Sequence, residues 1–108
     1  MIIRRKIRYV LVEASREINL GDKATVDGFQ RGLDKVLGDL HYADAGPKVV
    51  AQYSDRSFVV RVNRGTEDMV VLAMAFMKEI NGQPIGFYTI RTSGTIATLA
   101  KLHTRLYS

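Results

Sequence analysis

The sequence predicts an α+β fold of the ferredoxin-like split βαβ type, in which a four-stranded antiparallel sheet carries two helices on one face and a further helix follows at the C-terminus. Two observations support this prediction. The apolar patterns along the chain succeed one another as strand, helix, strand, strand, helix, strand and helix. The chain has 108 residues, 46% of them apolar, which is enough for the core of one domain spanning residues 1–108.

The first half of the chain contains a predicted strand and a predicted helix. Residues 7–14 are apolar at both parities, as is typical of a central strand covered on both faces. From Val26 the apolar residues follow a 3.6-residue period, which predicts an amphipathic helix of about five turns. Asp22 and Thr25 are candidate caps, and Gly46-Pro47 is the predicted stop. Three glycines inside this helix favour close packing against a neighbouring element: Gly28, Gly32 and Gly38.

The second half begins with a predicted antiparallel hairpin, formed by residues 48–53 and 57–63 around a polar turn. Thr66 is the predicted cap of a second helix, which Asn81-Gly82 closes. The predicted buried stripe of that helix comprises Val70, Ala73, Met74, Met77 and Ile80.

Residues 85–91 form the predicted fourth strand, and Ser93 begins the last helix. The apolar positions of this helix are residues 96, 99, 102 or 103, and 106. We expect it to cover the second face of the sheet, because the strands are apolar at both parities.

The positive charge of the chain lies at its two ends. The net charge is +5, yet neither residues 1–12 nor residues 83–108 contain an acid. These ends carry four and three basic residues, whereas the middle has nine basic residues against eleven acids, a sum of −2. If the fold brings the ends together, they form one positive surface, which is typical of proteins that bind a polyanion such as nucleic acid.

The sequence contains no group of residues that would make the chain an enzyme by itself. His41 and His103 are the only histidines and lack metal-ligand spacing, and there is no cysteine. The pair Glu67-Asp68 complements the dipole of a helix start rather than forming an acid–base pair. We therefore expect no catalytic residue and no metal or cofactor bound by the chain. Without a signal-like segment or an apolar run near the roughly 18 residues needed to span a bilayer, a soluble cytoplasmic protein is expected.

Two segments have the residue types that bind phosphate. Arg61 shares its strand parity with Val59 and therefore points away from Phe58, and its guanidinium matches phosphate oxygens in a bidentate manner. Residues 93–95, Ser-Gly-Thr, follow a strand and open a helix, where backbone amides can bind an anion. The residues around Phe58 do not match the RNA recognition motif signature, so base stacking on this strand is not expected.

Three short motifs resemble protein component 2 of archaeal ribonuclease P, a small-subunit family shared with eukaryotic ribonuclease P. They are Arg8-Tyr9 in the first strand, Val60-Arg61-Val62-Asn63-Arg64 at the end of the third, and Ser93-Gly94-Thr95-Ile96 at the start of the last helix. Their order and spacing agree with that family over nearly the whole chain.

This resemblance implies an RNA-binding subunit of the ribonucleoprotein that removes the 5′ leader from precursor tRNA. It also implies that the catalytic RNA and its magnesium ions carry the chemistry, and that the chain pairs with protein component 3 in a heterotetramer. The motifs add Tyr9 as a candidate RNA or partner contact. Charge and motifs together give this candidate RNA-binding set: Arg4, Arg5, Lys6, Arg8, Arg61, Arg64, Arg91, Ser93, Gly94, Thr95, Lys101 and Arg105.

Two other classes of function remain open from the sequence. One is a ferredoxin-like module that binds a small ligand or assembles through its sheet without nucleic acid. The other is a free-standing nuclease. Retention of RNA by the purified chain would argue against the first, and cleavage of precursor tRNA without an RNA subunit would favour the second.

Overall fold

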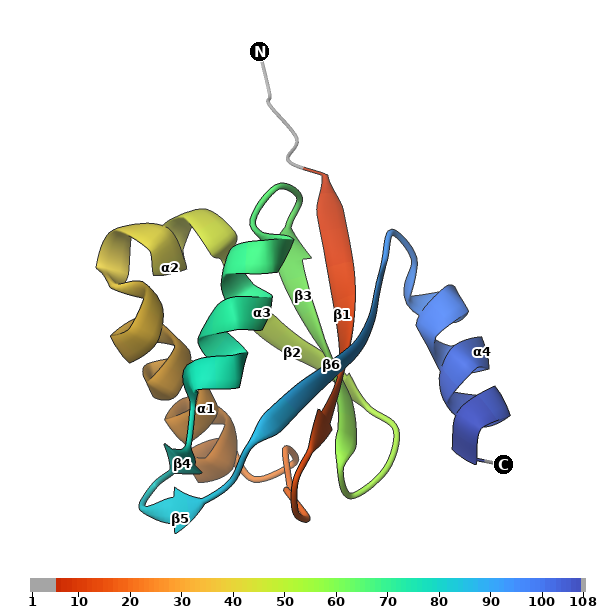
Figure 1. The fold of residues 1–108 in the computed structure, drawn as a ribbon, viewed down its shortest axis with the longest axis horizontal. Coiled ribbons are helices and arrows are strands. Elements are labelled where there is room, and N and C mark those ends of the chain that lie inside the picture. The colour runs from red at the N-terminus through yellow and green to blue at the C-terminus, as the bar shows by residue number, and fades with distance from the viewer. Residues whose placement is uncertain (1–5, 108) are drawn as a thin grey trace.

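A four-stranded antiparallel sheet forms the centre of the molecule in the computed structural model, which describes residues 6–107 (Figure 1). Its order is β2-β3-β1-β6, so the first strand is central and pairs with the last one. This is the topology expected for the split βαβ fold. The four strands are β1 (Ile7–Ala14), β2 (Lys48–Gln52), β3 (Ser57–Asn63) and β6 (Phe87–Ser93).

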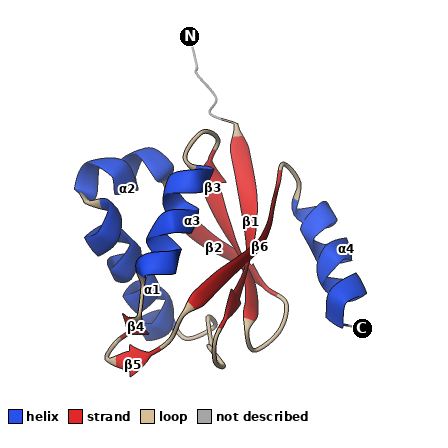
Figure 2. Ribbon diagram, in the orientation of Figure 1, coloured by secondary structure: helices blue, strands red, loops and turns tan. Residues whose placement is uncertain are grey.

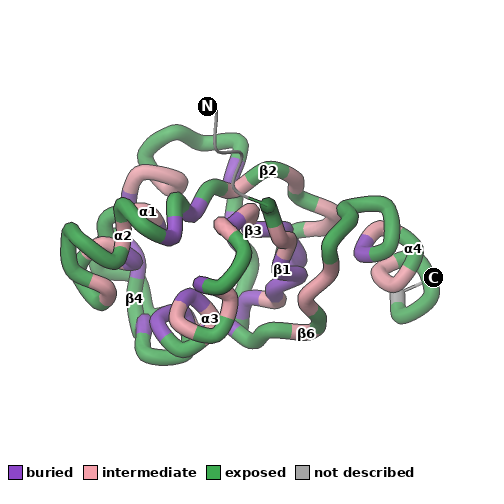
Figure 3. Tube along the Cα trace, turned by 90° about the horizontal axis from the view of Figure 1, so that it is seen from above, coloured by how far each residue is buried: buried purple, intermediate pink, exposed green. Residues whose placement is uncertain are grey.

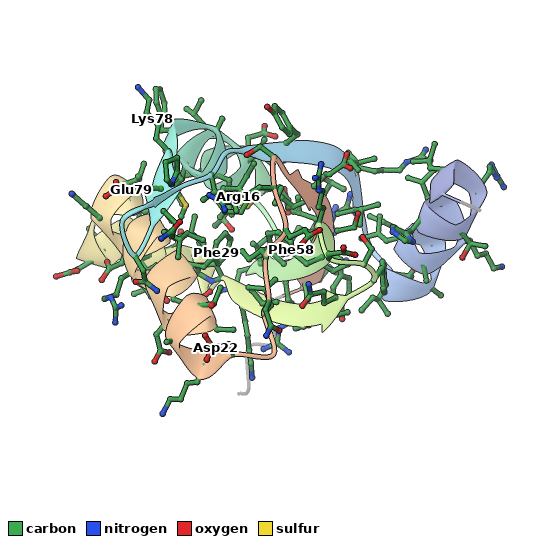
Figure 4. The ribbon with its side chains drawn as sticks, turned by 90° about the horizontal axis from the view of Figure 1, so that it is seen from below. Arg16, Asp22, Phe29, Phe58, Lys78 and Glu79 are labelled. Carbon is green, nitrogen blue, oxygen red and sulfur yellow. The ribbon has the colours of Figure 1, made fainter. Side chains whose placement is uncertain are left out.

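One face of the sheet is covered by α1 (Lys23–Leu37), α2 (Asp39–Ala45) and α3 (Glu67–Phe76), as Figure 2 shows. The main core lies between these helices and the sheet. At its centre the rings of Phe29, Phe58 and Phe87 meet edge to face, with centroids 5.3 to 5.9 Å apart. Figure 4 shows Phe29 of α1 and Phe58 of β3 directed into this interior.

The other face of the sheet carries α4 (Ile96–Tyr107), as predicted for an appended helix. Leu99 of α4 is fully buried against Leu11 of β1 and Val59 of β3, which point away from the main core. In the view of Figure 3 the buried residues concentrate between the sheet and α1 to α3, whereas α4 lies to one side and is mostly exposed. The second core is therefore small.

The single helix expected from Val26 onward is wrong, because the segment forms two helices. Gly38 separates α1 from α2 with a φ of 80°, a backbone conformation that side chains with a Cβ rarely adopt. Gly28 and Gly32 face closely packed neighbours, as predicted, but the prediction is wrong for Gly38, where nothing lies within 4 Å of the position of a Cβ. The start of α1 also differs from the expected capping, because the two candidate caps bond each other. The Thr25 hydroxyl donates to Asp22 Oδ2 over 3.0 Å, and the Asp22 side chain makes no hydrogen bond to the backbone.

The expected end of the second helix at Asn81-Gly82 is also wrong. α3 ends at Phe76, and a small hairpin follows, formed by β4 (Glu79–Ile80) and β5 (Gln83–Pro84). Asn81 and Gly82 are its turn, both with positive φ (53° and 81°), as the primed hairpin turns require. All five residues of the predicted stripe are buried, but Met77 and Ile80 lie beyond the helix.

The last strand and helix begin later than predicted. β6 starts at Phe87 rather than at residue 85 and includes Ser93, and α4 starts at Ile96.

Thr66 occupies the expected cap position of α3, but its hydroxyl donates to the Asn63 carbonyl oxygen over 2.6 Å. No helix in the described part of the chain is long and apolar enough to span a membrane.

Candidate nucleic-acid interface

Three basic side chains from the C-terminal part of the chain meet at one groove. Arg91 of β6 faces Lys101 and Arg105 of α4 across a groove of about 140 Å³, which Thr98 and Leu102 complete. Lys101 and Arg105 are one helical turn apart and therefore lie on the same side of α4. Among the described residues, the five that line this groove include no acid. We name these three residues the basic groove.

The turn before α4 is organised by hydroxyl groups. The Thr95 hydroxyl oxygen accepts a hydrogen bond from the Thr98 amide over 3.4 Å, and the two threonine hydroxyls bond each other over 2.7 Å. Ser93 Oγ accepts from the Thr95 amide over 3.2 Å. Two of the amides expected to be free for an anion are thus already bonded, and Thr95, not Ser93, is the cap of α4.

Arg8 joins this turn from the first strand. A Cβ placed on Gly94 would lie 3.4 Å from Arg8 Nη1, so the guanidinium rests against the turn. The pairing of Tyr9 with Ser93 holds the two segments side by side. The fold therefore brings Arg8 together with Ser93, Gly94 and Thr95, as expected from the proximity of the two chain ends.

Arg61 lies on the α4 side of the sheet, as its parity predicted. It is half-buried in β3, paired with Tyr9 of β1 on one side and with Lys48 of β2 on the other. Because Tyr9 in turn pairs with Ser93 of β6, one row of side chains crosses all four strands. We name this row, Lys48, Arg61, Tyr9 and Ser93, the polar row.

Lys6 and Arg64 form a separate pair at the end of the sheet where β1 begins. The Arg64 amide donates to the Lys6 carbonyl oxygen over 2.7 Å. Their side chains border a groove of about 450 Å³ together with Asp44, whose carboxylate offsets part of their charge. They are not part of the basic groove. Arg4 and Arg5, which complete the candidate set, lie outside the described residues.

Sequence reasoning missed two residues of this surface. Lys48 stands opposite Arg61, and only the register of the hairpin reveals this. Thr98 lines the basic groove, and its spacing of three residues from both Thr95 and Lys101 was the available signal. Within residues 6–107, no cluster of three or more histidines or acids has a geometry that could hold a metal ion.

Tyr53 contacts His103 in the second half of α4. Their ring centroids are 5.3 Å apart, and burial raises the pKa of the Tyr53 hydroxyl above its ordinary value. His103, one of two histidines considered as ligands, thus packs on an aromatic ring. His41 is exposed on α2.

Comparison with known proteins gives a consistent result. Residues 8–102 match the model of the Rpp14/Pop5 family. The chain is 30% identical to proteins named ribonuclease P protein component 2 from Methanocorpusculum labreanum, over 100 residues, and Methanosphaerula palustris, over 105 residues. Each alignment covers 92% of this chain, but only 67% and 62% of the respective relative.

A solved structure shares the fold. A chain in the cryo-EM structure of yeast ribonuclease MRP superimposes with a TM-score of 0.59 at 12% sequence identity. The match covers 98% of this chain and 95% of that one, so the fold is shared over nearly the whole length of both chains.

Proposed function

The chain belongs to the Rpp14/Pop5 family, and we propose on this basis that it is an RNA-binding protein subunit of ribonuclease P. In this role it assists the catalytic RNA in removing the 5′ leader from precursor tRNA. Magnesium ions held by the RNA supply the chemistry, and the chain supplies binding and positioning. A cytoplasmic location is part of the proposal.

The basic groove is the observation that carries this function. Arg91, Lys101 and Arg105 place three positive charges around one small depression, and a phosphate seated there meets cations from both β6 and α4. The guanidinium groups offer paired donors to phosphate oxygens, whereas Lys101 acts as a point charge. Each neutralised phosphate releases condensed counterions, so binding must weaken as salt increases.

The opposite side of the molecule is suited to a protein partner. Four apolar side chains of the helical layer are exposed, and two of them, Leu40 and Phe76, are 82% and 62% exposed. Phe76 borders a groove of about 440 Å³ between α1 and β4, with a basic rim that includes Lys35 and Lys78. Figure 4 shows Lys78 pointing outward from this region. The other two exposed apolar residues are Val36 and Leu72.

We assign this helical side to ribonuclease P protein component 3, in a heterotetramer. Exposed apolar residues rimmed by charge are typical of protein interfaces, and a protruding aromatic residue often contributes most of the binding energy. The sheet separates this surface from the basic groove, so RNA and protein can bind at the same time.

Reconstitution tests the function directly. The chain is combined with a ribonuclease P RNA and component 3, and cleavage of precursor tRNA is measured at limiting magnesium with and without the chain. We expect cleavage to require the chain, Arg91→Ala to weaken RNA binding, and Phe76→Ala to weaken only the complex with component 3. Equal cleavage without the chain, or RNA binding that does not depend on salt, would rule the function out.

A further inference from the structure

The polar row lies on a part of the sheet that α4 leaves open. Leu99, in the first turn of α4, packs on Leu11 and Val59, a cross-strand pair that lies two residue positions from the Tyr9–Arg61 pair, toward the β2–β3 turn. One turn later His103 reaches Tyr53 next to the β2–β3 turn. α4 therefore runs away from the row, as the course of α4 in Figure 1 also shows.

The row combines one aromatic ring with flanking groups that bind phosphate. Tyr9 is half-buried and packs against the buried cluster of Leu11, Val59 and Leu99. Arg61 and the exposed Lys48 lie on one side of it, and Ser93 lies on the other. Three strand spacings of about 4.8 Å give the row a length of about 14 Å.

Base stacking was not expected at Phe58, and this residue does not lie in the polar row. Phe58 is fully buried on the opposite face, in contact with Phe29 and Phe87. Tyr88 is on the sheet and 61% exposed, but its cross-strand neighbour is Glu13, whose carboxylate repels phosphate. Among Phe58, Tyr88 and Tyr9, only Tyr9 is both accessible to a base and surrounded by basic side chains.

We propose that the polar row binds an unpaired RNA strand, with one base stacked on Tyr9 and a flanking phosphate held by Arg61 and Lys48. The inference rests on the proposed RNA-binding function and specifies the form of RNA. A base in a duplex has both faces covered by its neighbours, so only an unpaired base can stack on a protein ring. The row therefore discriminates single strands from duplexes, whereas the basic groove binds phosphates of either.

Affinity measurements with two RNA probes test this proposal. The full chain is titrated with a short oligouridine strand and with a duplex of equal length, at one salt concentration. We expect Tyr9→Leu to lower the affinity for the single strand by about tenfold, the range typical for loss of one stacked base. Tyr9→Phe, which keeps the ring, should bind as the wild type does. The matched control Tyr88→Leu should also bind normally.

Salt dependence separates stacking from charge. Tyr9→Leu should leave the slope of log affinity against log salt unchanged, whereas Arg61→Ala should reduce its magnitude by about one. If Tyr9→Leu binds the single strand as well as Tyr9→Phe does, or loses equal affinity for the duplex, the stacking site is wrong.

Cross-linking keeps the proposal testable if Tyr9→Leu does not fold. Ultraviolet irradiation of the wild-type chain with oligouridine, followed by mass spectrometry, should give a cross-linked peptide that contains Tyr9. Cross-links confined to other peptides would contradict the site. A wild-type chain that binds neither RNA probe would contradict RNA binding itself. If the reconstituted enzyme cleaves precursor tRNA and Tyr9→Leu binds the single strand normally, only the stacking site is wrong and the proposed function stands.

Discussion

Gly28 and Gly32 allow α1 to approach the β4–β5 hairpin closely, but they face different neighbours. A Cβ on Gly28 would lie 2.6 Å from Asn81 Oδ1, and a Cβ on Gly32 would lie 2.5 Å from Met77 Cε. Asn81 is held in place, because its Nδ2 donates to the Ala24 carbonyl oxygen over 3.0 Å and its Oδ1 accepts from Arg31 over 3.2 Å. The methionine methyl is the end of a flexible side chain and can move.

We therefore expect opposite results from the same substitution at the two glycines. Gly28→Ala should lower the free energy of unfolding by about 1–3 kcal/mol, because the methyl group displaces a bonded side chain. Gly32→Ala should be neutral or stabilising, since replacing a helical glycine by alanine gains about 1 kcal/mol against the cost of moving Met77. Urea denaturation measures both, and equal stabilities of the two variants would contradict the role assigned to Asn81.

The helix break at Gly38 brings two carboxyl groups together. Asp34 lies in the last turn of α1, and Asp39 is the first residue of α2. Partial burial raises the pKa of the Asp34 carboxyl above its ordinary value, and a hydrogen bond with Asp39 and the charge of Asp39 raise this pKa further. The folded state thus favours protonated Asp34, and stability falls as the pH rises from about 4, the ordinary pKa, through the raised value.

Asp34→Asn should relieve this cost at neutral pH. We expect a higher unfolding temperature than that of the wild type at pH 7, and a gain that disappears once both carboxyl groups are protonated in acid. Thermal unfolding across this pH range provides the measurement. Asp27→Asn removes the same charge two turns earlier on α1 and is the control, so a gain of equal size in both variants would point to net charge instead of the Asp34–Asp39 pair.

At the scale of elements, the sequence predicted those that have a clear hydrophobic pattern and missed the boundaries that depend on a single backbone conformation. β1 and β3 have the predicted bounds, because both strands carry apolar residues at both parities that are buried at the centre of the sheet. The α1–α2 break depends on the positive φ of Gly38, which periodicity does not detect. The Asn81-Gly82 pair was a hairpin signal, but it also fits a helix end, and only the two-residue strands beside it decide between them.

In the candidate site, too, the sequence predicted one feature, the meeting of the chain ends, and missed another, the alignment of Lys48 with Arg61. The meeting of β1 with β6, and hence of Arg8 with residues 93–95, follows from topology alone and was predicted. The alignment of Lys48 with Arg61 depends on the register of β2, which contains an irregularity between residues 49 and 51. Register shifts of this kind leave no trace in the hydrophobic pattern of a short strand.

α4 is attached to the sheet chiefly through Leu99, and this makes the basic groove depend on one side chain. Leu99→Ala should weaken the packing by about 2 kcal/mol or more and speed amide exchange in α4, while β1 and β3 keep their protection through the main core. RNA affinity should fall as well, because Lys101 and Arg105 no longer face Arg91. Leu106→Ala, at a residue that is 54% exposed, is the matched control, and hydrogen exchange with mass spectrometry gives the readout. Unchanged exchange in α4 of Leu99→Ala would disprove this dependence.

At the scale of the whole molecule, the sheet divides two surfaces of different chemistry. The α4 side carries the basic groove and the polar row, and the helical side carries the exposed apolar residues such as Phe76. The acid-free residues 83–108 include β6 and α4, and their three basic residues, Arg91, Lys101 and Arg105, meet on the α4 side. Placement of charge, rather than its total, should then determine RNA binding.

Two double variants with the same net charge distinguish placement from total charge. The groove variant combines Arg91→Glu with Lys101→Glu, and the control variant combines Lys23→Glu with Lys78→Glu. Each variant lowers the net charge from +5 to +1, because every substitution changes the charge by −2. The first pair lies in the basic groove, whereas Lys23 and Lys78 are exposed on α1 and before β4, respectively. Binding of a ribonuclease P RNA is measured over a series of salt concentrations.

The groove variant should lose more than about tenfold in affinity, and the magnitude of its salt slope should fall by about two because two phosphate contacts disappear. The control variant should lose far less and keep the wild-type slope, because screening over about 8–10 Å at physiological salt isolates its charges from the RNA. Equal losses in both variants would mean that RNA responds to the overall field of the protein and that the basic groove is not a binding site. A loss confined to the groove variant would assign the charge of the two chain ends to direct contact with phosphate.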